Sequence, residues 1–149
     1  MANTTEFLQN MRRVTKLHET CLHPVCEQYH LTMIEATVIG FLKNNPGADT
    51  AADIVELRML SKSHVSQAVE ALIQKGLIAR KADPQDRRRI HLSLLPAAAP
   101  IIESILAIQN EFFQELHQGF SETDLQQYNM LNRRIQENAI KALERRKSS

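Results

Sequence analysis

The fold of this chain is decided by residues 50–94, which have the sequence TAADIVELRMLSKSHVSQAVEALIQKGLIARKADPQDRRRIHLSL. Apolar residues recur every three or four positions after Thr50, and again from Ser61 to Gly76. This period predicts two helices separated by about three residues. After Gly76 the period changes to two, which predicts strands over residues 77–81 and 89–94. The stretch is therefore expected to fold as two helices followed by a hairpin with a charged tip.

The flanking sequence is expected to be helical on both sides. A helix over residues 5–29 should be bent or interrupted at Pro24. Thr32 has the position of an N-cap for the next helix. Downstream, helices are expected over residues 96–118 and again after Ser121. The predicted fold class is mainly α with a small β-hairpin (α+β).

Charge is distributed unevenly along the 149 residues, although the formal net charge is only +1. Residues 61–91 contain seven lysines or arginines and three acidic residues, whereas residues 101–138 contain two arginines and six acidic residues. The hairpin region is therefore expected to carry a cationic face. The sequence shows neither a signal-peptide pattern nor a long apolar stretch, so we expect a soluble cytoplasmic protein without a membrane partner.

The order of two helices and a basic hairpin indicates a winged helix-turn-helix that binds double-stranded DNA. A helix in the major groove needs short hydrogen-bonding side chains near its N-terminus, and a wing needs arginines on a tight turn. Asp86 is the expected partner that holds a wing guanidinium in one orientation. The side chains that this reasoning assigns to DNA contact are Ser61, Lys62, Ser63, His64, Ser66, Gln67, Arg80, Asp86, Arg87, Arg88 and Arg89.

Each of these features alone has an ordinary interpretation. A polar helix side is usually a solvated face, and charged hairpin tips are common. Their combination, in this order and spacing, favours DNA binding. The sequence contains no glycine-rich phosphate loop and no Gly-x-Ser-x-Gly, so neither an enzyme nor a cofactor is expected.

The same motifs resemble the MarR family of bacterial transcriptional regulators. The resemblance is carried by Leu31-Thr32, residues 50–57, residues 61–69, Leu72-x-x-x-Gly76-Leu77-Ile78-x-Arg80 and Asp83-Pro84-x-Asp86-Arg87-Arg88. It implies a homodimeric regulator, expected to be a repressor associated with the bacterial nucleoid, on a palindromic operator. It also implies that Arg87 or Arg88 enters the minor groove, braced by Asp86, and that Thr50 lies near a phosphate.

The resemblance further implies three regions within one intertwined unit. Residues 1–30 form an N-terminal dimerisation helix, residues 31–95 the DNA-binding domain, and residues 96–149 the C-terminal dimerisation helices. The apolar load of the terminal helices supports a dimer, because it exceeds what one small winged domain can cover. Its members are Phe7, Leu8, Met11, Ile105, Phe112, Leu125 and Leu131.

The sequence leaves several alternatives open for the signal that controls the regulator. The resemblance implies release from DNA by a small aromatic or anionic effector, and Arg12, Lys16 and His18 are candidates to meet an anion. Cys21 and Cys26 leave open a thiol-based redox sensor. A metal-responsive regulator is a further alternative, whose candidate ligands are His18, Cys21, His23, Cys26 and His30. A winged-helix module that binds only protein is the remaining alternative.

Overall fold

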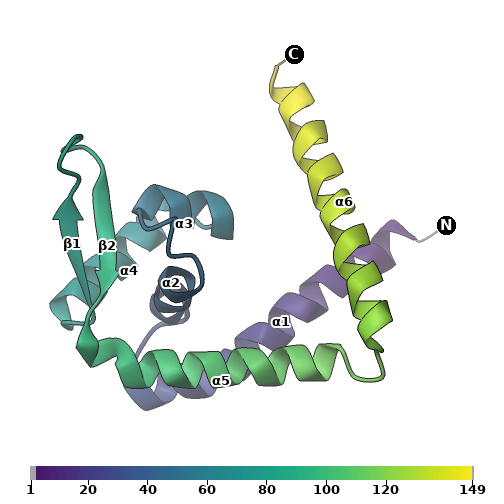
Figure 1. The fold of residues 1–149 in the computed structure, drawn as a ribbon, viewed down its shortest axis with the longest axis horizontal. Helices are drawn as coiled ribbons and strands as arrows, with labels where there is room; N and C mark the ends of the chain where they lie inside the picture. The colour runs from purple at the N-terminus through teal and green to yellow at the C-terminus, as the bar shows by residue number, and fades with distance from the viewer. Residues whose placement is uncertain (1–2, 149) are drawn as a thin grey trace. The chain divides into compact units, whose positions relative to one another are not determined.

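The computed structural model describes residues 3–148, so Met1, Ala2 and Ser149 of the predicted terminal regions lie outside the described residues. Within this range, helices and a hairpin follow one another in the predicted order (Figure 1). The helices are α1 (Thr4–Tyr29), α2 (Met33–Asn44), α3 (Ala51–Arg58), α4 (Lys62–Gln74), α5 (Ala99–Leu116) and α6 (Glu122–Lys147). The strands are β1 (Ile78–Ala82) and β2 (Ile90–Leu94). The predicted fold class is confirmed.

The sequence predicts a bend or an interruption at Pro24, and the interruption is wrong, because α1 runs through Pro24 as one helix. Proline removes the hydrogen bond to the carbonyl four residues earlier, which is that of Thr20. Pro24 lies on the exposed side of α1, where water can hydrate that carbonyl. The opposite side of the same turns is buried through Leu22, Val25 and Cys26, and this packing holds the helix together.

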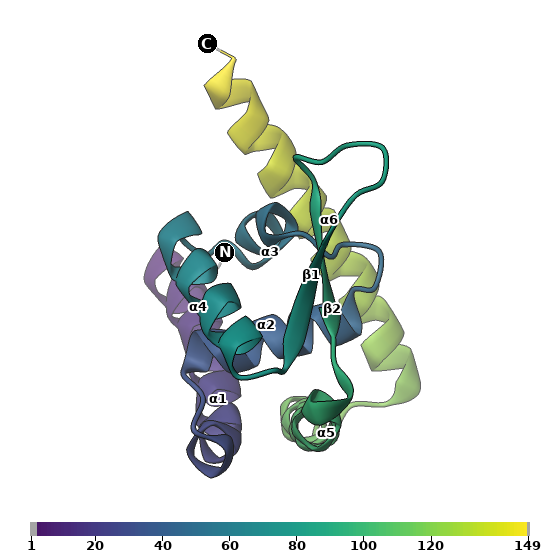
Figure 2. The ribbon, with the colours of Figure 1, turned by 90° about the vertical axis from the view of Figure 1, so that its left-hand side faces the viewer.

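The core of the winged region lies where α2, α3 and α4 pack on the hairpin. Figure 2 shows these three helices gathered on one side of β1 and β2. Helix α4 buries its predicted apolar side and leaves the opposite side exposed. The largest fully buried side chains are Ile39, Ile54, Leu72, Ile78, Val38 and Val65.

The hairpin is antiparallel, with Ile78 opposite Leu94 and Ala82 opposite Ile90. Each strand begins one residue later than predicted. Gly76 has φ +72, and the N–H of Leu77 donates to the carbonyl of Leu72, so Leu77 caps α4 and stays out of the ladder. At the other strand, the N–H of Arg89 donates to the carbonyl of Asp86 within the turn.

The helix expected to start at Pro96 begins instead as a 3-10 turn, η1 (Pro96–Ala98). Pro100 has no N–H to donate to the carbonyl of Pro96, and the N–H of Ala99 takes that acceptor in a tighter turn. Helix α5 then buries Ile101, Ile105 and Phe112.

The described residues form two compact units, divided between Phe112 and Phe113. In the second unit, His117 stacks on Phe113 and also meets Phe120 and Tyr128, which fixes the turn between α5 and α6. Of the described residues of α6, none is buried. Within residues 3–148, no helix has the length and apolar character needed to cross a membrane.

Candidate nucleic-acid interface

The start of α4 presents the polar side chains that the sequence assigns to base and phosphate contact. Ser61 is the N-cap, and its hydroxyl oxygen accepts from the N–H of His64 at 3.2 Å. Because Ser61 caps the helix, its structural role accounts for the residue without DNA. The other predicted side chains of this helix are all exposed, namely Lys62, Ser63, His64, Ser66 and Gln67.

An ion pair that the sequence analysis missed holds the far end of α4. The Nζ of Lys75 lies 2.6 Å from Oε1 of Glu35, which is buried, and 3.0 Å from the carbonyl oxygen of His30. Glu35 also closes the capping box of α2 with Thr32. The pair therefore ties the last turn of the recognition helix to the first turn of α2, and local sequence gives no signal for it.

Arg80, which the sequence assigns to phosphate, points at an acid. Its Nη2 lies 2.8 Å from Oε2 of Glu70 on α4, and both side chains are about half exposed. The pair joins β1 to the exposed side of α4. In this structure Arg80 is therefore neutralised by Glu70, and any phosphate has to compete with that carboxylate.

The wing, residues 83–89, is ordered by carboxylates that bind its backbone. Oδ1 of Asp83 accepts from the N–H groups of Gln85 and Asp86, at 2.8 and 3.1 Å. Oδ1 of Asp86 accepts from the N–H of Arg88 at 3.0 Å. Among residues 3–148, Asp86 forms no ion pair with an arginine, so the expected bracing of a guanidinium is absent and Asp86 shapes the turn instead.

A groove of about 640 Å³ brings together six of the twelve predicted DNA contacts. It lies between the start of α3, the exposed side of α4 and the wing. Thr50 lines it and also caps α3, in a reciprocal capping box with Asp53. The other lining residues from the predicted set are Ser66, Arg80, Asp86, Arg88 and Arg89. Arg87 is exposed on the wing but does not line the groove, which the sequence could not distinguish. The predicted residues nearer the start of α4 lie outside the groove as well, namely Ser61, Lys62, Ser63, His64 and Gln67.

The base of the wing is held by a histidine that the sequence analysis did not select. The Nδ1 of His91 lies 2.7 Å from Oδ1 of Asp49, and its Nε2 lies 2.8 Å from Oδ2 of Asp83. Hydrogen bonds that His91 donates to Asp83 and, to a smaller extent, to Asp49 raise the pKa of His91. Conversely, the hydrogen bond from His91 and those from the Gln85 and Asp86 N–H groups lower the pKa of Asp83 to about 2.

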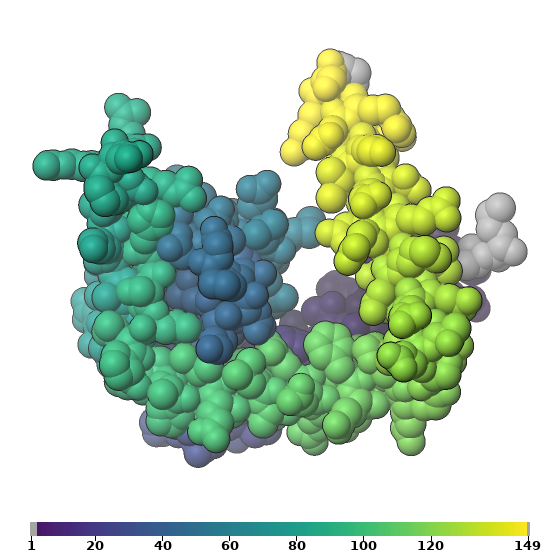
Figure 3. All heavy atoms as spheres, in the orientation of Figure 1, coloured from purple at the N-terminus to yellow at the C-terminus, as the bar shows by residue number. Residues whose placement is uncertain are grey.

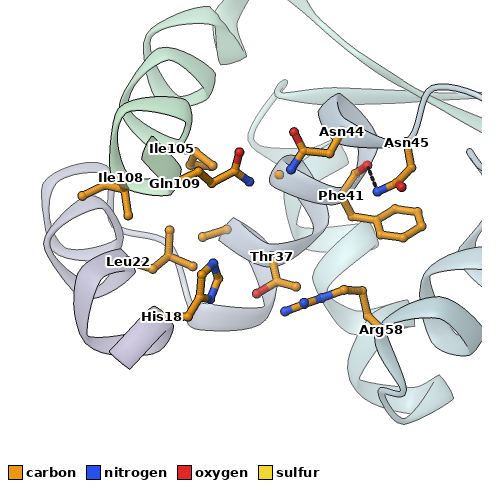
Figure 4. Close-up of a pocket in the computed structure, with 12 residues that line it drawn as sticks. His18, Leu22, Thr37, Phe41, Asn44, Asn45, Arg58, Ile105, Ile108 and Gln109 are labelled. Carbon is orange, nitrogen blue, oxygen red and sulfur yellow. Dashed lines mark hydrogen bonds between the residues drawn. The ribbon is translucent and has the colours of Figure 1, made fainter. Parts of the chain in front are cut away.

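A second cavity, of about 140 Å³, lies between α1, α2, α3 and α5 (Figure 4). Its walls are apolar at Leu22, Phe41, Ile105 and Ile108, and polar at His18, Thr37, Asn44, Asn45, Arg58 and Gln109. In Figure 4 the side chain of Arg58 extends toward Thr37. Burial and then the charge of Arg58 lower the pKa of His18.

The predicted effector residues separate in the structure. His18 lines this cavity, whereas Arg12 and Lys16 lie on the exposed side of α1. Arg58 brings a positive charge to this cavity. The sequence contains no sign of this role, because a basic residue in the last turn of a helix is common and is explained by the helix dipole.

The cysteines and histidines of α1 do not assemble into a site. Among residues 3–148, no three His, Cys, Asp or Glu side chains lie close enough together to hold a metal ion. Neither Cys21 nor Cys26 forms a disulfide in the part of the chain that the structure describes. Burial raises the pKa of Cys26, whose Sγ lies 3.8 Å from the carbonyl oxygen of Thr32, and a protonated thiol reacts poorly with oxidants.

The winged region of this chain matches a family model. Residues 30–89 match the model described as MarR family. A similar curated protein is YcgE of Bacillus subtilis (strain 168), an uncharacterized HTH-type transcriptional regulator that is 30% identical over 83 residues. That match covers 56% of this chain and 54% of YcgE, so the chain spans about half the length of this relative.

Solved structures show the same fold over nearly the whole chain. The S. aureus MepR–DNA complex superposes with a TM-score of 0.69 at 23% identity, covering 93% of this chain and 98% of MepR. Bordetella bronchiseptica BpsR, whose DNA binding is regulated by 6-hydroxynicotinic acid, superposes with a TM-score of 0.68 at 21% identity, covering 88% and 98%. Residues 30–89 therefore match the MarR family model, and the chain has the fold of a solved MarR-family transcriptional regulator from Silicibacter pomeroyi, with a TM-score of 0.77 at 18% identity, covering 91% of this chain and 89% of that one.

Proposed function

We propose that the chain is a transcriptional repressor that binds double-stranded DNA through the groove between α4 and the wing. The observation that carries the proposal is the composition of this groove, which joins Ser66 of the recognition helix to Arg88 and Arg89 of the wing. In Figure 3 the wing projects beyond the rest of the winged region. A projecting cationic turn beside an exposed helix matches the two grooves that a winged helix contacts.

Base choice is assigned to the exposed side chains near the start of α4, above all His64 and Gln67. Their donors and acceptors suit the edges of bases in the major groove. Lys62 and the wing arginines supply phosphate contacts, which carry affinity without sequence information. Selection of bound fragments from a random DNA pool tests this, and a single enriched motif is the expected result. Binding without any sequence preference would contradict it.

A homodimer on a palindromic site is the second part of the proposal. On α1, Phe7, Leu8 and Met11 are each about half exposed. The second unit exposes a larger apolar set, made of Phe113, Phe120, Tyr128, Met130, Leu131, Ile135, Ile140 and Leu143. Faces of this size are usually covered in a soluble protein, and a second copy of the chain is the partner that a two-fold operator requires.

Release by a small aromatic acid is the third part, and the cavity behind Arg58 supports it. A cavity of about 150 Å³ can hold a benzene ring, and this cavity measures about 140 Å³. Arg58 offers a guanidinium for a carboxylate, while Ile105 and Leu22 offer apolar contact. The regulator thus acts by binding alone, in the cytoplasm, without catalysis.

Calorimetric titration with benzoate tests the effector site. The Arg58→Met variant should bind benzoate about tenfold more weakly than the unmodified protein, because a charge-assisted hydrogen bond is lost. Arg12→Met, on the exposed side of α1, is the matched control and should bind benzoate normally. Equal losses in both variants, or in neither, would place the anion site elsewhere.

A further inference from the structure

We propose that His91 is the residue that positions the wing for DNA, by joining Asp49 and Asp83 through its two ring nitrogens. The proposal rests on the proposed function, because it concerns how the wing meets DNA. Asp49 precedes α3 and Asp83 begins the wing, 42 and 8 residues away from His91. One side chain thus connects the helix-turn-helix to the hairpin tip.

The contacts form a continuous path from the helices to the wing arginines. At one end, the N–H of Leu92 donates to the carbonyl of Asp49 at 2.8 Å, which fixes the loop beside β2. At the other end, Asp83 uses one oxygen for His91 and the other for the N–H groups of Gln85 and Asp86. Asp86 then holds the N–H of Arg88, so the orientation of Asp83 determines where the arginine turn lies.

His91 acts on DNA only through the wing. Its strand neighbours Ile90 and Leu92 line the groove, whereas His91 does not. Because successive side chains of a strand point to opposite faces, His91 lies on the other face of β2. It is therefore a positioning residue and leaves the groove free for DNA.

The bridge requires a protonated ring. A neutral imidazole donates from one nitrogen and accepts at the other, so one of the two carboxylates would face a lone pair. An imidazolium donates from both nitrogens and satisfies both acids. The charged groups around it are Asp49 from the loop before α3, Asp83 from the wing and Lys81 as the cross-strand partner on β1.

The direction of the pH dependence follows from the raised pKa of His91. A group whose pKa is raised on forming the bridge contributes fully below its ordinary value of 6.5. Its contribution is lost as the pH rises through the raised pKa. The wing should therefore be held in solution more acidic than pH 6.5 and released as the pH rises through the raised pKa of His91.

The first arm of the test needs no DNA. Nuclear magnetic resonance of the full chain follows the ring of His91 and the wing amides of Gln85, Asp86 and Arg88 between about pH 6 and about pH 9. We expect the wing amides to shift with the same midpoint as the ring, and His91→Gln to abolish that shift. Wing amides that stay constant while the ring titrates would overturn the proposal, whether or not the chain binds DNA.

The second arm measures affinity for a selected DNA site over the same pH range at constant ionic strength. The dissociation constant of the unmodified protein should rise about tenfold toward high pH, in line with the loss of one charge-assisted hydrogen bond. His91→Gln should bind weakly throughout, without the step. His64→Gln replaces the histidine of α4 and should keep the step, whereas loss of the step in this variant would assign it to His64.

Asp49→Ala separates positioning from simple charge. Removal of a negative charge near phosphates strengthens binding if only long-range electrostatics matters. If Asp49 holds His91 and the wing, the same change weakens binding at neutral pH about fivefold, by loss of a hydrogen bond. Tighter DNA binding by Asp49→Ala would overturn the proposal. The control variant is His23→Gln, which replaces an exposed histidine on α1 and should leave the affinity for DNA unchanged.

Discussion

At the scale of single residues, the DNA-facing surface depends on polar partners that are far apart in sequence. Lys75 and Glu35 are separated by 40 positions, and His91 and Asp49 by 42. Each pair holds an element to which we assign DNA contacts, α4 in the first case and the wing in the second. Neither pair lines the groove, although both elements border it.

Replacement of Lys75 by Met should leave the buried carboxylate of Glu35 without its cation. We expect the free energy of unfolding to fall by about 2 kcal/mol, less than for a fully buried pair because Lys75 is partly exposed. Urea denaturation measures this loss. Lys81→Met, an exposed lysine on β1, is the matched control, and an equal loss in both variants would show that the Glu35 contact stabilises nothing.

Replacement of Glu70 by Gln should release Arg80 for phosphate. The DNA dissociation constant is expected to fall several-fold, and the dependence on salt should become steeper by about one unit, as for one added phosphate contact. Glu103→Gln makes the same charge change on the exposed side of α5. If both variants bind DNA equally, net charge alone explains the result and Arg80 makes no phosphate contact.

At the scale of elements, most of the order and type of helices and strands could be predicted from periodicity and capping. The capping boxes of Thr32 and Thr50 and the buried side of α4 follow from local spacing. The errors lie where non-local packing or backbone chemistry decides, as at Pro24 and Pro100. Within the candidate site, the sequence predicted the exposed side chains. It did not predict the contacts of His91, Lys75 and Arg58, because periodicity shows which side of an element is buried and not which polar groups lie close together.

Helix α1 gives a direct test of this reasoning. Pro24→Ala restores an N–H donor to the carbonyl of Thr20 and removes the steric cost of proline inside a helix. We expect the free energy of unfolding to rise by about 1–3 kcal/mol, because Pro24 is exposed and its replacement removes little packing from the core. A decrease on thermal or urea unfolding would show that α1 needs its proline, for example to follow the curvature of its packing partners.

At the scale of the whole molecule, we expect a second copy of the chain to cover the exposed apolar residues of α1 and of the second unit. Sedimentation is expected to give twice the chain mass of 17.0 kDa. Ile135→Asp should shift the protein to the monomer, because a charge in an apolar interface has no counterion. Glu137→Asp, a conservative change at a nearby acidic position, should remain dimeric. A monomeric unmodified protein would contradict the dimer and with it the two-fold operator.

The central claim is that the groove between α4 and the wing binds DNA, and the two neighbouring arginines of the wing test it most directly. Arg88 lines the groove and Arg87 does not, although they carry the same charge on the same turn. The measurement is the affinity of Arg88→Ala and Arg87→Ala for a selected operator as a function of salt. Arg88→Ala should bind at least tenfold more weakly, with a salt slope reduced by about one unit, and Arg87→Ala should lose clearly less. Equal affinity of Arg88→Ala and the unmodified protein at moderate salt would contradict the account.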